Sequence, residues 1–217
     1  RRAEGVQQET SWVTFLFCTA LLAWVLGMAL GSTNYKYNTA PYTQIASLKS
    51  YSGIDPGRTL GMQVLDAGSI SFTSDAHLDL SKSMGFKSGS VYCAAPIVSG
   101  STHMTYDFWA VGLDCCSDGN SDFHCGDYKN PKARAGLRVW RDSDLGTYKS
   151  AVQEAMAVHG INSQNAILLT WMEDPATEYR AYKNDSVRCF CLGIYIYIIV
   201  HFFCVLLTIA VGKISRW

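Results

Sequence analysis

Residues 11–35 of this chain read SWVTFLFCTALLAWVLGMALGSTNY, and residues 189–212 read CFCLGIYIYIIVHFFCVLLTIAVG. Neither stretch contains an Asp, Glu, Lys or Arg, and each exceeds the roughly 20 apolar residues that cross a bilayer core about 30 Å thick. A signal-peptide core is shorter, at about 7–15 residues. We therefore predict two transmembrane α-helices that flank an α+β, cysteine-rich soluble domain. The predicted segments are an N-terminal tail (1–10), transmembrane helix 1 (11–31), the domain (32–188), transmembrane helix 2 (189–212) and a C-terminal tail (213–217).

The segment between the predicted helices is long enough, at about 155 residues, to bury a hydrophobic core of its own. The chain has 18 basic and 18 acidic residues, so the formal net charge is zero. This balance shows no excess of basic residues that would bind the phosphates of a nucleic acid. We therefore predict that nucleic acid is not a partner. Basic residues flank the helices on both sides, so the positive-inside rule does not orient the domain.

Six of the eight cysteines lie in or beside this segment, an even number that favours disulfides and an oxidising lumen or exterior. The disulfide candidates are Cys93, Cys115, Cys116, Cys125, Cys189 and Cys191. Adjacent cysteines can scarcely bond each other, so we expect Cys115 and Cys116 to have different partners, with Cys93 and Cys125 the nearest. The remaining connectivity is open, and Cys189 and Cys191 are also compatible with reduced thiols at the membrane surface.

The domain sequence favours a small, mostly antiparallel sheet with at least one packed helix. Residues 34–68 show little periodicity and are interpreted as an extended lead-in. Asp142–Asp144 supply N-cap candidates for a helix that Gly160 ends. Runs bounded by Gly, Ser and Asp predict strands at residues 69–73, 90–98, 104–113, 136–141 and 166–172.

Two metal sites are weighed at the cysteine-rich loop and set aside. A zinc site built from Cys115, Cys116, His124 and Cys125 lacks the usual ligand spacing. A calcium loop starting at Asp118 lacks the Gly and Glu that an EF-hand needs at its sixth and twelfth positions. No nucleophile elbow, Walker loop, zinc-protease or C-x-x-C motif is present, so we predict no enzymatic activity and no bound metal.

The predicted helices carry two features that favour neighbours in the membrane. Ala23, Gly27 and Gly31 form a small-residue face on which another helix can pack closely. His201 lies near the middle of the second helix, where a polar group needs a protein, water or ligand partner. Two roles stay open for it, a hydrogen bond to a neighbouring helix and ligation of a pigment magnesium or haem iron.

Between Tyr106 and Tyr182 several motifs occur in order: DFWAVGLDCC, DFHCG, NPKARAGLRVWRD, AVQEA and WMEDP. On these motifs the chain resembles a dinoflagellate family of membrane-anchored proteins that share FWAVGxxCC, DFHCG and WMxDP. The resemblance implies an accessory subunit of a photosystem I–light-harvesting antenna supercomplex. It also implies a thylakoid location in the plastid, with the domain in the lumen. Core or antenna helices would be the partners, and chlorophyll a or carotenoid would lie at the transmembrane helices.

The first reading is therefore a non-catalytic structural subunit of a large membrane complex, embedded in the lipid bilayer. One alternative is a binding module of the plasma membrane or secretory pathway with a disulfide-rich ectodomain, which a glycan on the Asn184 sequon would favour. The other is a membrane-tethered redox or metal-dependent enzyme that uses the cysteine cluster. Because no initiator Met is present, we expect that a presequence has been removed.

Overall fold

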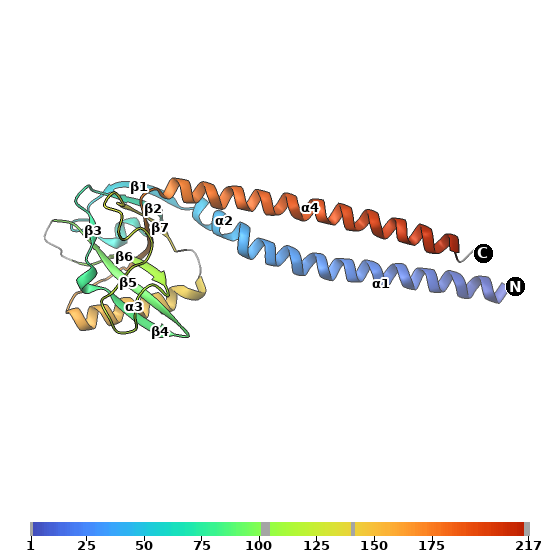
Figure 1. Cartoon of the computed structure of the whole chain (residues 1–217), viewed down its shortest axis with the longest axis horizontal. Helices are drawn as coiled ribbons and strands as arrows, with labels where there is room; N and C mark the ends of the chain where they lie inside the picture. The colour runs from blue at the N-terminus through green and yellow to red at the C-terminus, as the bar shows by residue number, and fades with distance from the viewer. Residues whose placement is uncertain (1, 101–104, 140–141, 215–217) are drawn as a thin grey trace. The chain divides into compact units, whose positions relative to one another are not determined.

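The computed structural model describes residues 2–100, 105–139 and 142–214, and it divides into two compact units. Pro41–Ala181 form a domain that contains the described strands, and Arg1–Ala40 with Tyr182–Trp217 form the second unit. Figure 1 shows the strands and α3 of the domain, and the two long helices α1 and α4.

Two helices are long and apolar enough to cross a membrane. The first is α1 (Arg2–Asn34), which continues through a π-helical turn, η1 (Tyr35–Thr39), into α2 (Ala40–Ala46). The second, α4 (Pro175–Ile214), has 40 residues. Large apolar side chains along both helices are exposed, from 42% for Val205 to 70% for Leu30.

The helices extend beyond the apolar stretches that predicted them. α4 begins at Pro175 rather than near Cys189, because the carboxylate of Asp174 caps its first turn and accepts a hydrogen bond from the backbone N–H of Ala176 at 2.9 Å. Proline is well suited to the first helical position, since its missing N–H needs no partner there. Hydropathy alone marks only the uncharged part of such a helix.

The domain is built on an eight-stranded mixed sheet with the strand order β1-β2-β7-β8-β6-β5-β3, in which β4 also pairs with β5. The pairs β1–β2 and β6–β8 are parallel and the others are antiparallel, which confirms a mostly antiparallel sheet. The strands are β1 (Lys49–Ile54), β2 (Ala67–Phe72), β3 (His77–Leu78), β4 (Met84–Ser88), β5 (Ser90–Val98), β6 (Phe108–Leu113), β7 (Ala135–Arg138) and β8 (Ile167–Met172).

Each face of the sheet buries its own core, because successive side chains of a strand point to opposite faces. On β6, Trp109 and Val111 pack beneath α3 (Asp142–His159), while Phe108 and Ala110 belong to the core on the other face. Loops and the cysteine cluster cover that second core. Ala94 on β5 lies in the α3 core, and its neighbour Cys93 lies in the loop-covered core.

Most predicted elements are confirmed with small shifts at their ends. The run 90–98 is β5, and the predicted helix is α3, followed by Gly160 with a φ of +62°, a left-handed conformation that suits glycine. The strand predicted at 104–113 begins only at Phe108, because Asp107 turns its side chain to bond a loop. Residue 104 and residues 140–141 lie outside the described residues.

The prediction of an extended lead-in over residues 34–68 is wrong. This segment contains α2, the edge strand β1 and a short 3₁₀ helix, η2 (Gly61–Val64). The sequence of β1, KSYSGI, has no apolar alternation because the strand is largely exposed on the sheet edge. The short strand β3 and the strand β4 were also not predicted.

Candidate functional site

The cysteine cluster joins strand β5 to the loop that follows β6. Cys93 bonds Cys116, and Cys115 bonds Cys125, with Cα–Cα distances of 5.8 Å and 5.2 Å. The adjacent cysteines therefore have different partners, as their covalent geometry predicts. These two bonds hold the loop of residues 114–126 against the sheet.

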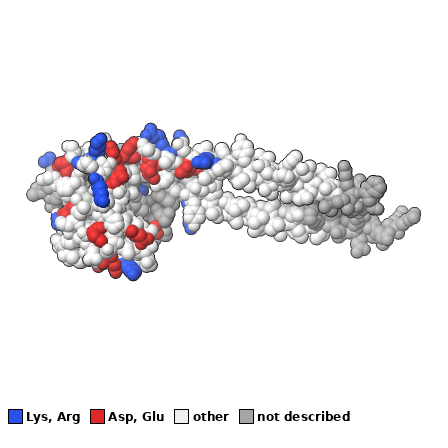
Figure 2. Space-filling view, viewed as in Figure 1, with Lys and Arg blue, Asp and Glu red and all other residues white. Residues whose placement is uncertain are grey.

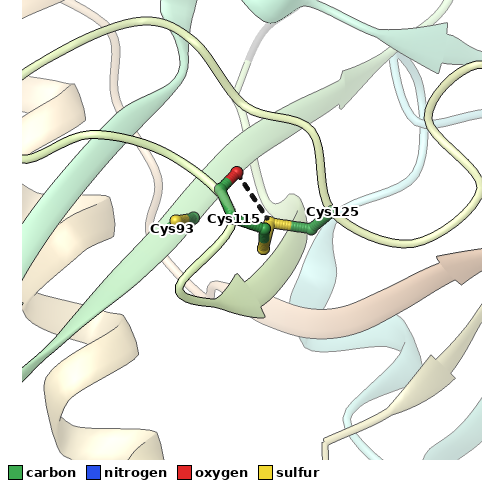
Figure 3. A group of neighbouring side chains, drawn as sticks. All are labelled: Cys93, Cys115 and Cys125. Carbon is green, nitrogen blue, oxygen red and sulfur yellow. Dashed lines mark hydrogen bonds between the residues drawn. A yellow bond between two sulfur atoms is a disulfide. The ribbon is translucent and has the colours of Figure 1, made fainter.

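The two disulfides lie directly beside each other. The sulfur atoms of Cys93, Cys115 and Cys125 are all within 4.8 Å of one another. Figure 3 shows these three side chains and the bond between Cys115 and Cys125. Cys93 and Cys125 are buried, whereas Cys115 and Cys116 are half-buried. Each disulfide thus joins one buried residue to one that solvent reaches.

Two glycines clear the space that these sulfur atoms occupy. A Cβ on Gly112 would lie 2.6 Å from the sulfurs of both Cys115 and Cys125, and one on Gly85 would lie 2.8 Å from the sulfur of Cys116. Gly112 is also the Cα partner of Cys93 across the β5–β6 ladder. The glycine of the FWAVG motif is therefore required by the packing of the cluster.

The zinc alternative does not fit this arrangement, because Cys115, Cys116 and Cys125 are bonded in disulfides. The exposed ring of His124 has its Nδ1 2.9 Å from the carbonyl oxygen of Asp122. In the calcium alternative, the candidate ligand Asp122 is likewise already engaged by the protein. The Asp122 carboxylate accepts hydrogen bonds from the backbone N–H and the hydroxyl of Ser117, and these two bonds lower its pKa.

Cys189 and Cys191 are free, so of the two alternatives left open for them the structure has the reduced thiols and not the disulfides. Both lie on α4, where residues two apart point about 200° apart around the helix axis and cannot bond each other. Cys189 is half-buried and Cys191 is exposed. Cys18 and Cys204 are also free and exposed.

The buried carboxylate of Asp107, which sequence reasoning missed, ties two loops to the start of β6. Asp107 is 1% exposed. Its Oδ1 accepts hydrogen bonds from the backbone N–H groups of Gln164 and Asn165 and from the hydroxyl of Ser163, and its Oδ2 accepts one from the N–H of Gly61. A buried carboxylate with four donors is fully satisfied, so its role is structural.

The histidines of the domain do not assemble into a catalytic group within the described residues. His77 contacts the carbonyl of Asp75, and His159 has its Nε2 3.4 Å from the carbonyl of Ser83. These contacts lie on different elements. His103 lies outside the described residues.

A shallow hollow of about 290 Å³ lies beside strands β1 and β2 and is bounded by residues 45–48 and the first turn of α4. Its lining is rich in hydroxyls, and those of Ser50 and Ser69 hydrogen-bond each other at 2.7 Å. The Asp174 carboxylate at its rim is engaged by Thr177 and the N–H of Ala176, and these bonds lower its pKa. The hollow therefore offers hydroxyls and one hydrogen-bonded carboxylate as polar contacts.

The two units differ in the charge of their surfaces. Figure 2 shows acidic and basic side chains interspersed over the domain, whereas most of the visible, described surface of the helices is uncharged. The mixed signs form no basic stripe on the described part of this face.

The small-residue face of α1 has open space beside it. Ala23, Gly27 and Gly31 are exposed, and a Cβ added at either glycine would meet no atom within 4 Å. The glycines are therefore not required by packing within the described chain.

One face of α4 carries His201 and Tyr197, whose rings stack with centroids 5.9 Å apart and planes within 10° of parallel. Tyr197 was not predicted, although its spacing of four residues from His201 places the two side chains on one helix face. His201 itself is exposed. Nearer the start of α4, the hydroxyl of the buried Ser186 donates a hydrogen bond to the hydroxyl of Thr39, so the Asn184 sequon lies within a helix with its serine engaged.

No protein-family model, curated protein or solved structure matches this chain. The resemblance to the dinoflagellate family stays a prediction.

Proposed function

We propose that this chain is an integral membrane protein with two spans and acts as a non-catalytic accessory subunit of a large membrane complex. The observation that carries the proposal is the exposed apolar surface of α1 and α4. Side chains such as Phe17 and Phe202 are 66% and 59% exposed on helices that are uncharged over about 24 residues. Apolar surface in water costs roughly 25 cal/mol per Å², and lipid or a partner helix removes that cost.

The two helices would dock against helices of neighbouring subunits. The open glycine face at Gly27 and Gly31 supports close backbone approach, which drives association where lipid supplies no hydrophobic force. The exposed His201 beside Tyr197 supports a polar contact within the membrane, either a hydrogen bond or ligation of a pigment metal.

The domain would cap the complex on the oxidising side of the membrane. Its two disulfides brace the loop after β6, and disulfides persist in such compartments. Its histidines are dispersed and its buried Asp107 is saturated by donors, which supports a structural rather than catalytic role.

The host complex that we propose is a photosystem I–antenna supercomplex of a dinoflagellate thylakoid, with the domain in the lumen. This step rests on the resemblance of the DFWAVGLDCC, DFHCG and WMEDP motifs. Chlorophyll a, held through its magnesium by His201, and carotenoid are the pigments that the helices would contact.

The test is to solubilise the native membrane in mild detergent, separate its complexes on a native gel, and identify by mass spectrometry the bands that contain this chain. We expect the chain to co-migrate with a pigmented complex of high mass. Migration of the chain alone and without pigment contradicts the proposal and leaves a membrane-anchored binding module.

Variants sharpen this test. We expect Gly27→Leu with Gly31→Leu, and separately His201→Leu, to shift the chain out of the large complex. Val25→Leu and Phe202→Leu alter positions off the glycine face and beside the histidine, and they serve as matched controls that keep the chain in the complex. Equal retention of all four variants would show that neither face is the docking surface.

A further inference from the structure

We propose that the four bonded cysteines form a single thiol–disulfide exchange unit rather than two independent braces. In this unit, opening of the Cys93–Cys116 disulfide releases a Cys93 thiolate that attacks the Cys115–Cys125 disulfide. The external reactant is a dithiol, on a small molecule or on a protein. This reactivity goes beyond the proposed structural role and does not depend on it.

The position of Cys93 supports the internal attack. Its sulfur lies within 4.8 Å of the sulfurs of both Cys115 and Cys125. The residue is on β5, which pairs with β4 on one side and β6 on the other, so its backbone is held in place. Because Gly112 opposite has no side chain, nothing from that strand separates Cys93 from the second disulfide.

The burial of the four residues gives the order of events. Cys116 is half-buried and Cys93 is fully buried, so an external thiolate meets Cys116 first and Cys93 becomes the leaving group. The released thiolate faces the other disulfide rather than solvent. The second disulfide repeats the pattern, with half-buried Cys115 joined to buried Cys125.

The chemistry balances at each step. The external dithiol first forms a mixed disulfide with Cys116, and its second thiol then displaces Cys116, so the external molecule is oxidised to its disulfide and Cys93 and Cys116 are reduced. In the internal step the bond between Cys115 and Cys125 breaks and a bond from Cys93 to one of them forms. The proton lost by the Cys93 thiol ends on the sulfur that leaves.

The test uses the full chain in mild detergent, with the free cysteines Cys18, Cys189, Cys191 and Cys204 replaced by serine so that no other thiol competes. In this background, Cys116→Ser leaves Cys93 as the odd thiol. We expect alkylation and peptide mapping to find Cys93 bonded to Cys115 or Cys125 in part of the molecules, with the displaced cysteine alkylated. Complete alkylation of Cys93 with Cys115–Cys125 intact overturns the proposal.

The matched control is Cys93→Ser in the same background, which leaves Cys116 as the odd thiol. Cys116 can scarcely bond its neighbour Cys115, so we expect the Cys115–Cys125 disulfide to persist and Cys116 to be alkylated. Exchange that is equal in both variants would point to general scrambling and would also overturn the proposal.

A second measurement keeps all four cysteines of the cluster. The background protein with all four cluster cysteines is treated with increasing dithiothreitol, quenched with acid and alkylated. Among molecules that have lost one disulfide, we expect some to contain a bond from Cys93 to Cys115 or Cys125. A population with only the two native bonds contradicts an exchange unit.

Discussion

Trp109 in the domain and Trp24 in α1 both lie in apolar stretches, yet Trp109 is fully buried and Trp24 is 62% exposed. The domain folds its apolar side chains into two cores of its own, one on each face of the sheet. The helices present theirs outward over most of their length. The difference teaches that the same residue types serve two environments: within the described residues, the domain covers its apolar side chains, whereas those of the two helices are left exposed.

The largest expected effect tests this difference with the two tryptophans. Trp109→Ala removes a buried ring and its Nε1–H bond to the carbonyl of Tyr106, so we expect a loss of about 3–5 kcal/mol in the unfolding free energy of the domain. Denaturant unfolding of the full chain in mild detergent, followed by near-UV circular dichroism, measures it. Trp24→Ala is the control and should change that free energy by less than about 0.5 kcal/mol. Equal losses of unfolding free energy in the two variants would contradict the difference in burial between the domain and the helices.

The next effect concerns the cysteines. Replacing Cys93 and Cys116 together by alanine opens a loop closed over a sequence separation of 23, and we expect a loss of about 2–4 kcal/mol in domain stability. The same unfolding measurement reports it, and a reducing agent should remove the difference from the unmodified chain. Cys189→Ala with Cys191→Ala changes only free thiols and should leave the domain unaffected.

A smaller effect is expected at Asp107. Asp107→Asn keeps the shape of the side chain but turns one acceptor into a donor that faces backbone N–H groups, so we expect a loss of about 1–3 kcal/mol. Amide hydrogen exchange should rise at Gly61, Gln164 and Asn165, whose N–H groups donate to this carboxylate. The exposed Asp118→Asn, which alters a single bond to the N–H of Lys87, is the control. A similar loss in the control would show that burial is not the cause.

The smallest effect is the response to acid. Hydrogen bonds to Ser117 lower the pKa of Asp122, and those to Thr177 and Ala176 lower the pKa of Asp174. The stability that these carboxylates contribute is present above the unfolded pKa of about 4 and is lost as pH falls through the lower folded values. We expect the melting temperature of the domain to fall between pH 5 and about pH 3, and less so in Asp122→Asn. Far-UV helicity of the uncharged segments should not follow that change.

The local sequence pattern predicted those elements whose side chains mostly lie in a single environment, either the exposed apolar helices or the buried central strands. The uncharged stretches predicted the two long helices, and the apolar runs at 90–98 and 166–172 predicted two central strands of the sheet. The adjacent cysteines predicted two different partners. Pattern failed at β1 and β4, because pairing with a neighbouring strand, rather than the composition of these segments, makes them strands.

The sequence by itself determined the division into two apolar helices and a cysteine-rich domain, because charge and hydropathy are properties of each residue in order along the chain. It also determined that Cys115 and Cys116 do not bond each other. Only the tertiary structure decided that Cys93 lies within 4.8 Å of a second disulfide, that Gly85 and Gly112 make room for the sulfurs, and that Asp107 joins segments 46 and 58 residues away. These contacts arise from strand pairing and loop packing between segments that are distant in the sequence. The spacing of residues within any one segment therefore does not reveal them.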